Sequence, residues 1–249
     1  MLENKSNIIT GKHHREDRIL RTLFIPKILE YVSENNGFVA GGAVRGVFTS
    51  DHVNDLDIFF KDAKDFNKDG QFDNGFETQE DGGHKILFYK TDVAWTHKPE
   101  FRHQKLPLHQ MICAVFGSPE EVIKQFDFTM SMAAWIPQTG EFIMDEYFLK
   151  HCSQKRLVFN INAQYPICSM WRAVKFIKRG WKLPAIDCIK LALKINNLDF
   201  KNKGELKRQL MGIDTSFLRE LTDALENDKE GAYDFGEAIE KISTLLDED

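Results

Sequence analysis

The stretch that decides the fold runs from Phe38 to Phe60 and reads FVAGGAVRGVFTSDHVNDLDIFF. Its opening apolar run predicts a short strand. Gly41 and Gly42 then let the backbone turn sharply and approach a bound phosphate with no Cβ in the way. The helix expected next directs its N-terminal N–H groups to the same point. Arg45 can reach phosphate oxygens with a two-pronged hydrogen bond, or pair with a nearby carboxylate. The pattern predicts a loop that cradles a triphosphate.

Two acidic residues follow in the segment NDLDIFF. Asp55 and Asp57 are two positions apart on an expected strand and therefore point to one side, while Leu56 and Ile58 point to the other side and can be buried. Two carboxylates this close repel each other unless a cation lies between them, and hard oxygen ligands favour Mg²⁺ or Mn²⁺. A pair of such ions serves nucleotidyl transfer, because it can activate a hydroxyl and stabilise a leaving pyrophosphate.

The order of strand, Gly-Gly, short helix and Asp-x-Asp resembles the nucleotidyltransferases of the DNA polymerase β superfamily. It is most similar to the head domain of CCA-adding enzymes and bacterial poly(A) polymerases. Their Gly-Gly-x-Val-Arg-Asp segment is matched by Gly41, Gly42, Val44 and Arg45, with Gly46 in place of the aspartate. Their Asp-x-Asp is matched by Asp55 and Asp57, which the resemblance implies are catalytic and metal-binding.

Two later segments extend the resemblance to about residues 37–180. The segment FDFTMSMAAW resembles the family's Arg-Asp-Phe-Thr-Ile-Asn-Ala-Leu motif, with Phe126 in place of the arginine and Ser131 in place of the asparagine. The segment YPICSMWRAVKFIKRGW resembles the one that joins head to neck. These matches imply nucleotide-binding roles for Asp127, Arg172 and Lys175, although a basic stripe on a helix is also typical of a solvated surface. The family's base-reading Glu-Asp-x-x-Arg motif is missing, so the transferred base stays unassigned.

Asp92 is the candidate for a third catalytic carboxylate. It heads the expected strand DVAWT, and in the superfamily such a strand often presents an additional acidic residue to the metals. A turn residue after Lys90 and Thr91 is an equally good interpretation.

The patterns predict an α+β fold in two domains. Residues 1–18 are expected to be a flexible N-terminus, and residues 19–160 a nucleotidyltransferase head with a mixed β-sheet flanked by helices. Residues 161–249 are expected to form a small all-helical, neck-like domain, with helices near 169–181, 184–196, 215–227 and 236–246. With this length, we expect the chain to lack the body and tail of a full-length CCA-adding enzyme.

Composition limits the partners. The formal net charge of −5 argues against a surface coated with basic residues for non-specific nucleic-acid binding. The clustered basic residues are Arg172, Lys175, Lys178, Arg179 and Lys182. No secretory signal or membrane span is indicated, so we expect a soluble cytoplasmic protein, including that of a phage or mobile element in a host. The four cysteines are widely spaced, which favours reduced thiols.

Two classes of function remain open. In the first, the chain is a template-independent nucleotidyltransferase that uses Mg²⁺ or Mn²⁺ and a nucleoside triphosphate, with an RNA 3′ end as the acceptor that the resemblance implies. In the second, it is a regulatory or binding protein that kept the fold, or a transferase that modifies a protein or small molecule. Phe126 and the missing base-reading motif favour the second class, whereas Asp55 and Asp57 favour the first.

Overall fold

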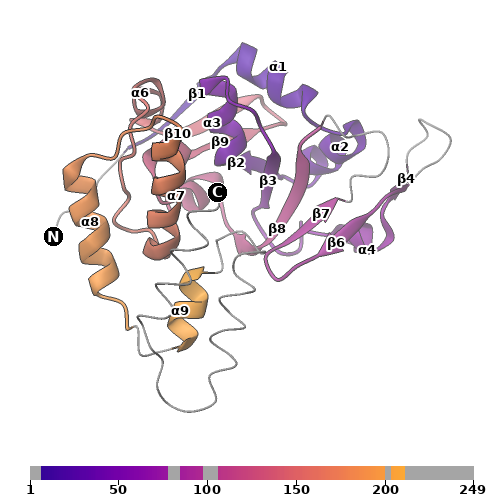
Figure 1. Cartoon of the computed structure of the whole chain (residues 1–249). Helices are drawn as coiled ribbons and strands as arrows, with labels where there is room; N and C mark the ends of the chain where they lie inside the picture. Colours follow the sequence, from indigo (N-terminus) through magenta and orange to yellow (C-terminus); the bar gives the residue numbers. More distant parts are fainter. Residues whose placement is uncertain (1–6, 78–84, 98–105, 200–202, 211–249) are drawn as a thin grey trace. The chain divides into compact units, whose positions relative to one another are not determined.

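The computed structural model describes residues 7–77, 85–97, 106–199 and 203–210 (Figure 1). The chain divides into two compact units, residues 1–162 and 163–249. Within the described residues, no helix combines the length and the apolar character needed to cross a bilayer.

The first unit is built on an eight-stranded sheet with the strand order β1-β10-β9-β2-β3-β8-β7-β6 (Figure 1). Neighbouring strands are antiparallel, except that β3 and β8 are parallel. Strands β4 and β5 form a separate two-stranded sheet. The strands are β1 (Ile8–Lys12), β2 (Phe38–Ala40), β3 (Asp55–Phe60), β4 (Phe76–Glu77), β5 (Lys85–Ile86), β6 (Phe88–Lys90), β7 (Ala94–His97), β8 (Leu108–Phe116), β9 (Ala133–Ile136) and β10 (Glu141–Asp145).

Short helices surround this sheet. The α-helices of the first unit are α1 (His14–Thr22), α2 (Pro26–Glu34), α3 (Gly42–Thr49), α4 (Gln71–Asn74), α5 (Pro119–Ile123) and α6 (Phe148–Ser153), and the 3₁₀ helices are η1 (Lys68–Gly70) and η2 (Thr129–Ser131). Helix α5 begins as predicted, because Ser118 and Glu121 form a reciprocal capping box and Pro119 fits the first helical position.

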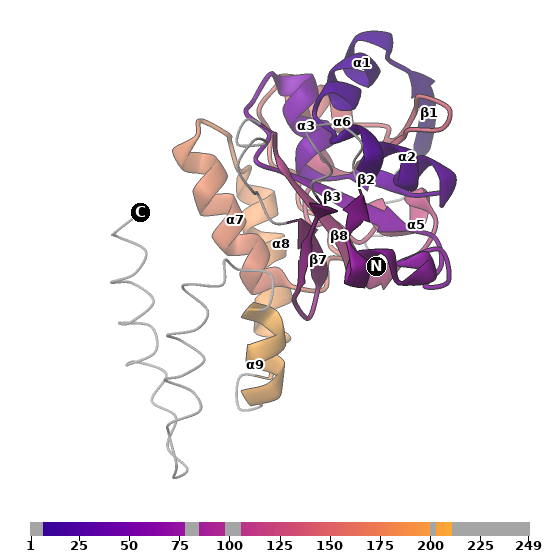
Figure 2. The same ribbon diagram turned by 90° about the vertical axis from the view of Figure 1, so that its right-hand side faces the viewer.

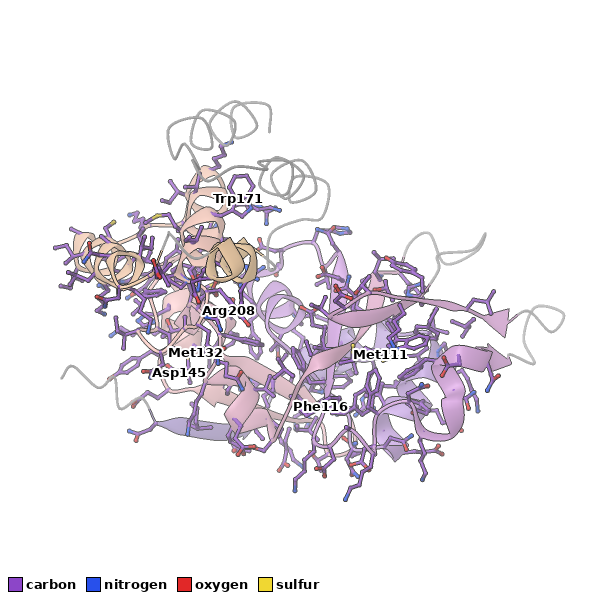
Figure 3. The ribbon with its side chains drawn as sticks, turned by 90° about the horizontal axis from the view of Figure 1, so that it is seen from below. Met111, Phe116, Met132, Asp145, Trp171 and Arg208 are labelled. Atoms are coloured by element: carbon purple, nitrogen blue, oxygen red, sulfur yellow. The ribbon has the colours of Figure 1, made fainter. Side chains whose placement is uncertain are left out.

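One face of the sheet is covered by α1, α2 and α3 (Figure 2). Leu56, Ile58 and Met111 point to this face and are fully buried (Met111 is labelled in Figure 3). Where α1 gives way to α2, the backbone N–H of Ile25 donates to Nε2 of His109 on β8. The covered face therefore holds the predicted core side of β3.

The opposite face is covered by α5 over β2, β9 and β10. Phe38, Ala40 and Phe59 from the sheet pack with Val122 and Ile123 of α5 in one apolar cluster. Asp55 and Asp57 point to this same face at the start of β3, and both are half-buried. The face is thus apolar where α5 covers it and acidic at the end of β3.

The N-terminal residues differ from the prediction. Residues 8–18, expected to be flexible, include β1 and the start of α1, and β1 pairs with β10 from Ile8↔Asp145 to Lys12↔Glu141 (Asp145 is labelled in Figure 3). Local patterns do not show this strand, because it depends on pairing with residues more than 120 positions away.

The second unit is helical in its described part, with α7 (Pro166–Lys178), α8 (Ala185–Asn196) and α9 (Lys203–Leu210) (Figure 1). Helix α7 packs against α8 and α9. The amide of Gln209 in α9 donates to the backbone oxygen of Gln164, which holds α9 to the segment before α7. The helices predicted near 215–227 and 236–246 lie outside the described residues. The α+β prediction for the chain is confirmed.

Candidate active site

The turn after β2 depends on glycine. Gly41 has φ +82° and ψ −125°, a conformation that side-chain-bearing residues rarely adopt. A Cβ at Gly41 would lie 3.3 Å from the ring of Phe126. The backbone N–H of Gly41 donates to the oxygen of Ala133, and the oxygen of Gly41 accepts from the N–H of Arg45. Both backbone groups of Gly41 are therefore hydrogen-bonded at the point where α3 begins.

Gly42 and Arg45 lie together at the start of α3. A Cβ at Gly42 would have Nη2 of Arg45 at 3.9 Å as its nearest neighbour, so the space beside this glycine is open apart from the guanidinium. Nη1 of Arg45 lies 3.7 Å from Sδ of Met130. The guanidinium of Arg45 thus lies beside Gly42 at the start of α3, and its contact with phosphate stays a prediction.

The same guanidinium acts on a buried thiol. Burial raises the pKa of Cys152 from its ordinary value of 9.0 to about 12, and the positive charge of Arg45 opposes this rise. Sγ of Cys152 contacts the backbone oxygen of Met130. This thiol is therefore protonated at neutral pH and is a structural neighbour of Arg45 rather than a nucleophile.

The two carboxylates lie beside the glycine loop. Strands β2 and β3 pair antiparallel, with Phe38 opposite Phe59 and Val39 opposite Ile58. Extending this register by one residue places Ala40 opposite Asp57, so that Gly41 leaves the sheet next to the acidic pair. Opposed residues share one face of a sheet. The glycine loop and the two carboxylates, which were predicted separately, therefore lie at the same end of β3.

The carboxylate pair fits a Mg²⁺ site of the kind completed by substrate. Among the described residues, no group of three or more His, Cys, Asp or Glu side chains is arranged to hold a metal. Mg²⁺ usually takes one or two protein carboxylates and keeps water and substrate phosphate as its other ligands. Asp55 and Asp57, half-buried on one face, match that donor set.

Two polar residues next to the pair were not found from the sequence. The parallel register of β3 and β8 places Gln110 opposite Asp57, and the antiparallel register of β8 and β7 places Thr96 opposite Gln110. Their side chains thus continue the row that contains Asp57. No local signal marks them, because the two strand pairings join segments that lie apart in the sequence.

Asp92 does not join the pair. It lies exposed in the turn between β6 and β7, where Oγ1 of Thr91 accepts hydrogen bonds from the N–H groups of Val93 and Ala94. The backbone oxygen of Val93 accepts from Cys113, three residues beyond Gln110 on β8. At about 3.3 Å per residue, Asp92 is roughly 10 Å or more further along the sheet than Asp57. This placement favours the turn interpretation, and a catalytic role for Asp92 stays an untested prediction.

Phe126 and Asp127 are held by a buried amide. Nδ2 of Asn160 donates to the backbone oxygens of Lys124 and Phe126, both at 2.8 Å, and the N–H of Asn160 donates to the oxygen of Asp127. The ring of Phe126 packs between Gly41 and Phe59. An apolar ring thus borders the glycine loop where the similar family has an arginine.

The structure also places Gly46 of α3 and the basic residues Arg172 and Lys175 of α7. A Cβ at Gly46 would lie 2.9 Å from Cγ2 of Val53, so an aspartate would not fit there without a shift of Val53. Arg172 and Lys175 are exposed on α7 of the second unit. Their role in nucleotide binding stays a prediction.

The fold of this chain is similar to that of solved CCA-adding enzymes. A complex with CTP aligns with a TM-score of 0.56 and 14% identity over 86% of this chain and 55% of that one. A complex with ATP aligns with a TM-score of 0.54 and 14% identity over 96% and 55%. The Thermotoga maritima enzyme with tRNA aligns with a TM-score of 0.52 and 12% identity over 86% and 54%. The chain thus has the polymerase β-like nucleotidyltransferase fold, as the sequence predicted.

Sequence comparison assigns the chain to a specific family. Residues 5–155 match the family described as Gabija anti-defense 2 family protein, and the chain belongs to this family. A protein of Bacillus phage SPbetaL7 named Gabija anti-defense 2 is 29% identical over 227 residues, which cover 90% of this chain and 52% of that protein. The chain therefore spans about half the length of the curated relative that it matches.

Proposed function

We propose that the chain is a metal-dependent nucleotidyltransferase that moves a nucleoside monophosphate from a nucleoside triphosphate to an acceptor hydroxyl. The observation that carries this proposal is the pairing of β2 with β3, which brings Gly41 and the carboxylates of Asp55 and Asp57 to one end of a rigid sheet. Transfer of a nucleotide requires a phosphate-binding loop and a metal-binding acidic pair at the same end of the fold.

Each part has a defined task in this proposal. Asp55 and Asp57 hold Mg²⁺ or Mn²⁺, which when bound polarises phosphate oxygens and lowers the pKa of a coordinated hydroxyl. Gly41 and Gly42 let the triphosphate approach the backbone, and the first N–H groups of α3 donate to its oxygens. Arg45 adds a positive charge beside Gly42, where Nη2 already lies.

The first candidate acceptor is an RNA 3′ end, most simply one that is tRNA-like. Two observations support it: the fold is that of CCA-adding enzymes, one of which was solved with tRNA, and the second unit carries exposed basic residues on α7. These basic residues are few, and each of them can contact one phosphate. RNA binding is therefore expected to be weak and to fall with salt in proportion to those contacts.

The second candidate acceptor is a hydroxyl on a component of the Gabija system, and the family's name favours it. In this version the nucleotide is added to a protein side chain. Phe126 does not decide between the two acceptors. Its ring borders the glycine loop, which in this proposal holds the triphosphate and not the acceptor. A protein that only binds through the retained fold is the remaining alternative.

The test is transfer of label from triphosphates labelled on the α-phosphate. The full chain is incubated with Mg²⁺ and each of the four labelled ribonucleotides over tRNA, purified Gabija components and small alcohols in separate arms. Covalent label on one acceptor supports the proposal and names that acceptor. Absence of label in every arm, with triphosphate binding retained, would contradict the enzyme and favour the binding protein.

A further inference from the structure

Helix α8 of the second unit is buried on one side and exposes apolar residues on the opposite side. Asp187 and Leu191 face inward and are buried, and Asp187 pairs with Lys190 at 3.0 Å. Ile186, Ile189 and Leu193 lie on the other side at helical spacing and are 54%, 54% and 60% exposed. We name these three residues the outer stripe. An apolar stripe at helical spacing is typical of a helix side that another part of a protein covers.

Charge divides this unit into two unlike parts. Residues 163–210, which contain α7, α8 and α9, carry eleven lysines and arginines against three aspartates and glutamates. Residues 211–249 carry three lysines and arginines against twelve aspartates and glutamates. The two parts nearly neutralise each other, so an acidic segment is joined directly to a basic set of helices.

The acidic segment also has the apolar residues that the outer stripe needs. Its sequence places apolar side chains at helical spacing in two runs: Phe217, Leu218, Leu221 and Leu225, then Ile239, Ile242 and Leu246. Aspartates and glutamates alternate with them, as on an amphipathic helix that faces a basic surface. Length is no obstacle, because 39 residues can extend far beyond α8, whose 12 residues rise about 18 Å.

From these observations we infer that residues 211–249 dock on the outer stripe of α8 in the same chain. The exposed apolar residues supply the contact, and the opposite charges of the two parts select the partner. A tethered segment acts at an effective concentration of about a millimolar, which favours it over a second copy of the chain at micromolar concentration. This inference does not depend on the proposed transfer activity.

The experiment places a photo-crosslinking amino acid at Ile189 of the full chain. The matched control carries it at Tyr89, which is 42% exposed on β6 of the first unit. After irradiation, monomers are separated from cross-linked dimers, digested and analysed by mass spectrometry. We expect cross-links within the monomer to residues 211–249, at a yield roughly fivefold above that at Tyr89, as a tethered contact would give.

Leu193→Glu is the second variant. It places a carboxylate in the outer stripe, and this charge should repel the acidic residues of 211–249 and weaken their docking. Combined with the cross-linker at Ile189, it should return the yield to the level of the Tyr89 control. Placing the cross-linker at Leu193 repeats the test should the Ile189 variant fail to fold. Cross-links mainly between two copies, mainly to another part of the chain, or at the control level would each overturn the inference.

Discussion

The two faces of the eight-stranded sheet differ in what covers them. On one face, α1, α2 and α3 cover β3, and Leu56 and Ile58 are fully buried. On the other face, α5 covers the sheet around Phe59, while Asp55 and Asp57 at the start of β3 stay half-buried. Alternate residues of one strand thus contribute to a closed apolar core and to an accessible acidic pair.

This difference explains how the site is held. Because the covered face fixes β3 through Leu56 and Ile58, the carboxylates on the other face have little freedom to move apart. A site positioned by a packed strand is more precise than one positioned by a loop. Substitutions on the two faces should therefore have opposite kinds of effect, one on transfer and the other on stability.

The largest effect is expected from the acidic pair. Asp55→Asn or Asp57→Asn should reduce nucleotide transfer by at least about a hundredfold, because partners one shell further from a metal already cost about ten- to a hundredfold. Stability should stay equal or rise slightly as like-charge repulsion is relieved. Asp92→Asn is the matched control and should retain transfer, since Asp92 lies in the turn between β6 and β7. Full activity in both pair variants would contradict the assignment.

The next largest effect is a loss of stability at Leu56, which lies between the two aspartates in sequence and points to the covered face. Leu56→Ala should lower the free energy of unfolding by about 2–5 kcal/mol, as removal of a fully buried leucine usually does. Urea unfolding measures the loss. Transfer per folded molecule should stay near that of the wild type under conditions where the variant is folded. If Leu56→Ala leaves stability unchanged, the face described as covered is not packed.

A smaller effect is expected at Asn160, whose amide holds the backbone around Phe126. Asn160→Leu leaves the backbone oxygens of Lys124 and Phe126 without their donor, which should cost about 2 kcal/mol of stability. It should also weaken triphosphate binding by about tenfold, or about 1.4 kcal/mol, because Phe126 borders the loop.

The matched control for Asn160 is Gln138→Leu. The amide of Gln138 likewise donates to two backbone oxygens, those of Val32 and Ser33, but on the far side of the first unit at the end of α2. Its loss should lower stability and leave triphosphate affinity unchanged. Calorimetric titration with triphosphate, paired with urea unfolding, separates the two outcomes. Equal affinities in both variants would make Asn160 a structural residue only.

The smallest effect concerns Cys152 behind α3. Its raised pKa means that the folded state holds the thiol proton where the unfolded state loses it, so this group makes the protein less stable as pH rises from 9.0 to about 12. At neutral pH it should resist thiol reagents while exposed Cys188 reacts. Mass spectrometry after brief labelling reads both sites. Equal labelling of the two cysteines in the folded protein would contradict the burial.

Local sequence was enough to predict the parts of the site that lie close together in the chain. The strand, glycine turn, helix and acidic strand between Phe38 and Phe60 follow from alternation, glycine freedom and family resemblance, and the structure contains all four. Sequence could not reveal Gln110 or Thr96, because their place beside Asp57 depends on pairings between distant strands.

The remaining differences have the same physical origin. The strand β1 pairs with β10, and three of its five residues are exposed, so its own sequence gives a weak signal. Asp92 preceded an apolar strand in the expected way, but the register of β7 on β8 moves it to the other end of the sheet. Phe126 was visible as a departure from the family, whereas its contact with Gly41 was not.

The central claim is that the glycine loop and the acidic pair together bind a metal-bound triphosphate. The most direct measurement is the melting temperature of the full chain with and without Mg²⁺ and a nucleoside triphosphate. At a ligand concentration of about 100 times the dissociation constant, binding should add about 2.7 kcal/mol. That corresponds to a rise of about 5–10 °C.

The variants Gly42→Val and Gly11→Val make this measurement decisive. The first puts a branched side chain into the open space beside Arg45, and the second adds one on β1, where a Cβ meets only His13 at an ordinary 3.6 Å. We predict that the rise is present in the wild type and in Gly11→Val and is lost in Gly42→Val. No rise in the wild type, or an equal rise in Gly42→Val, would contradict the claim.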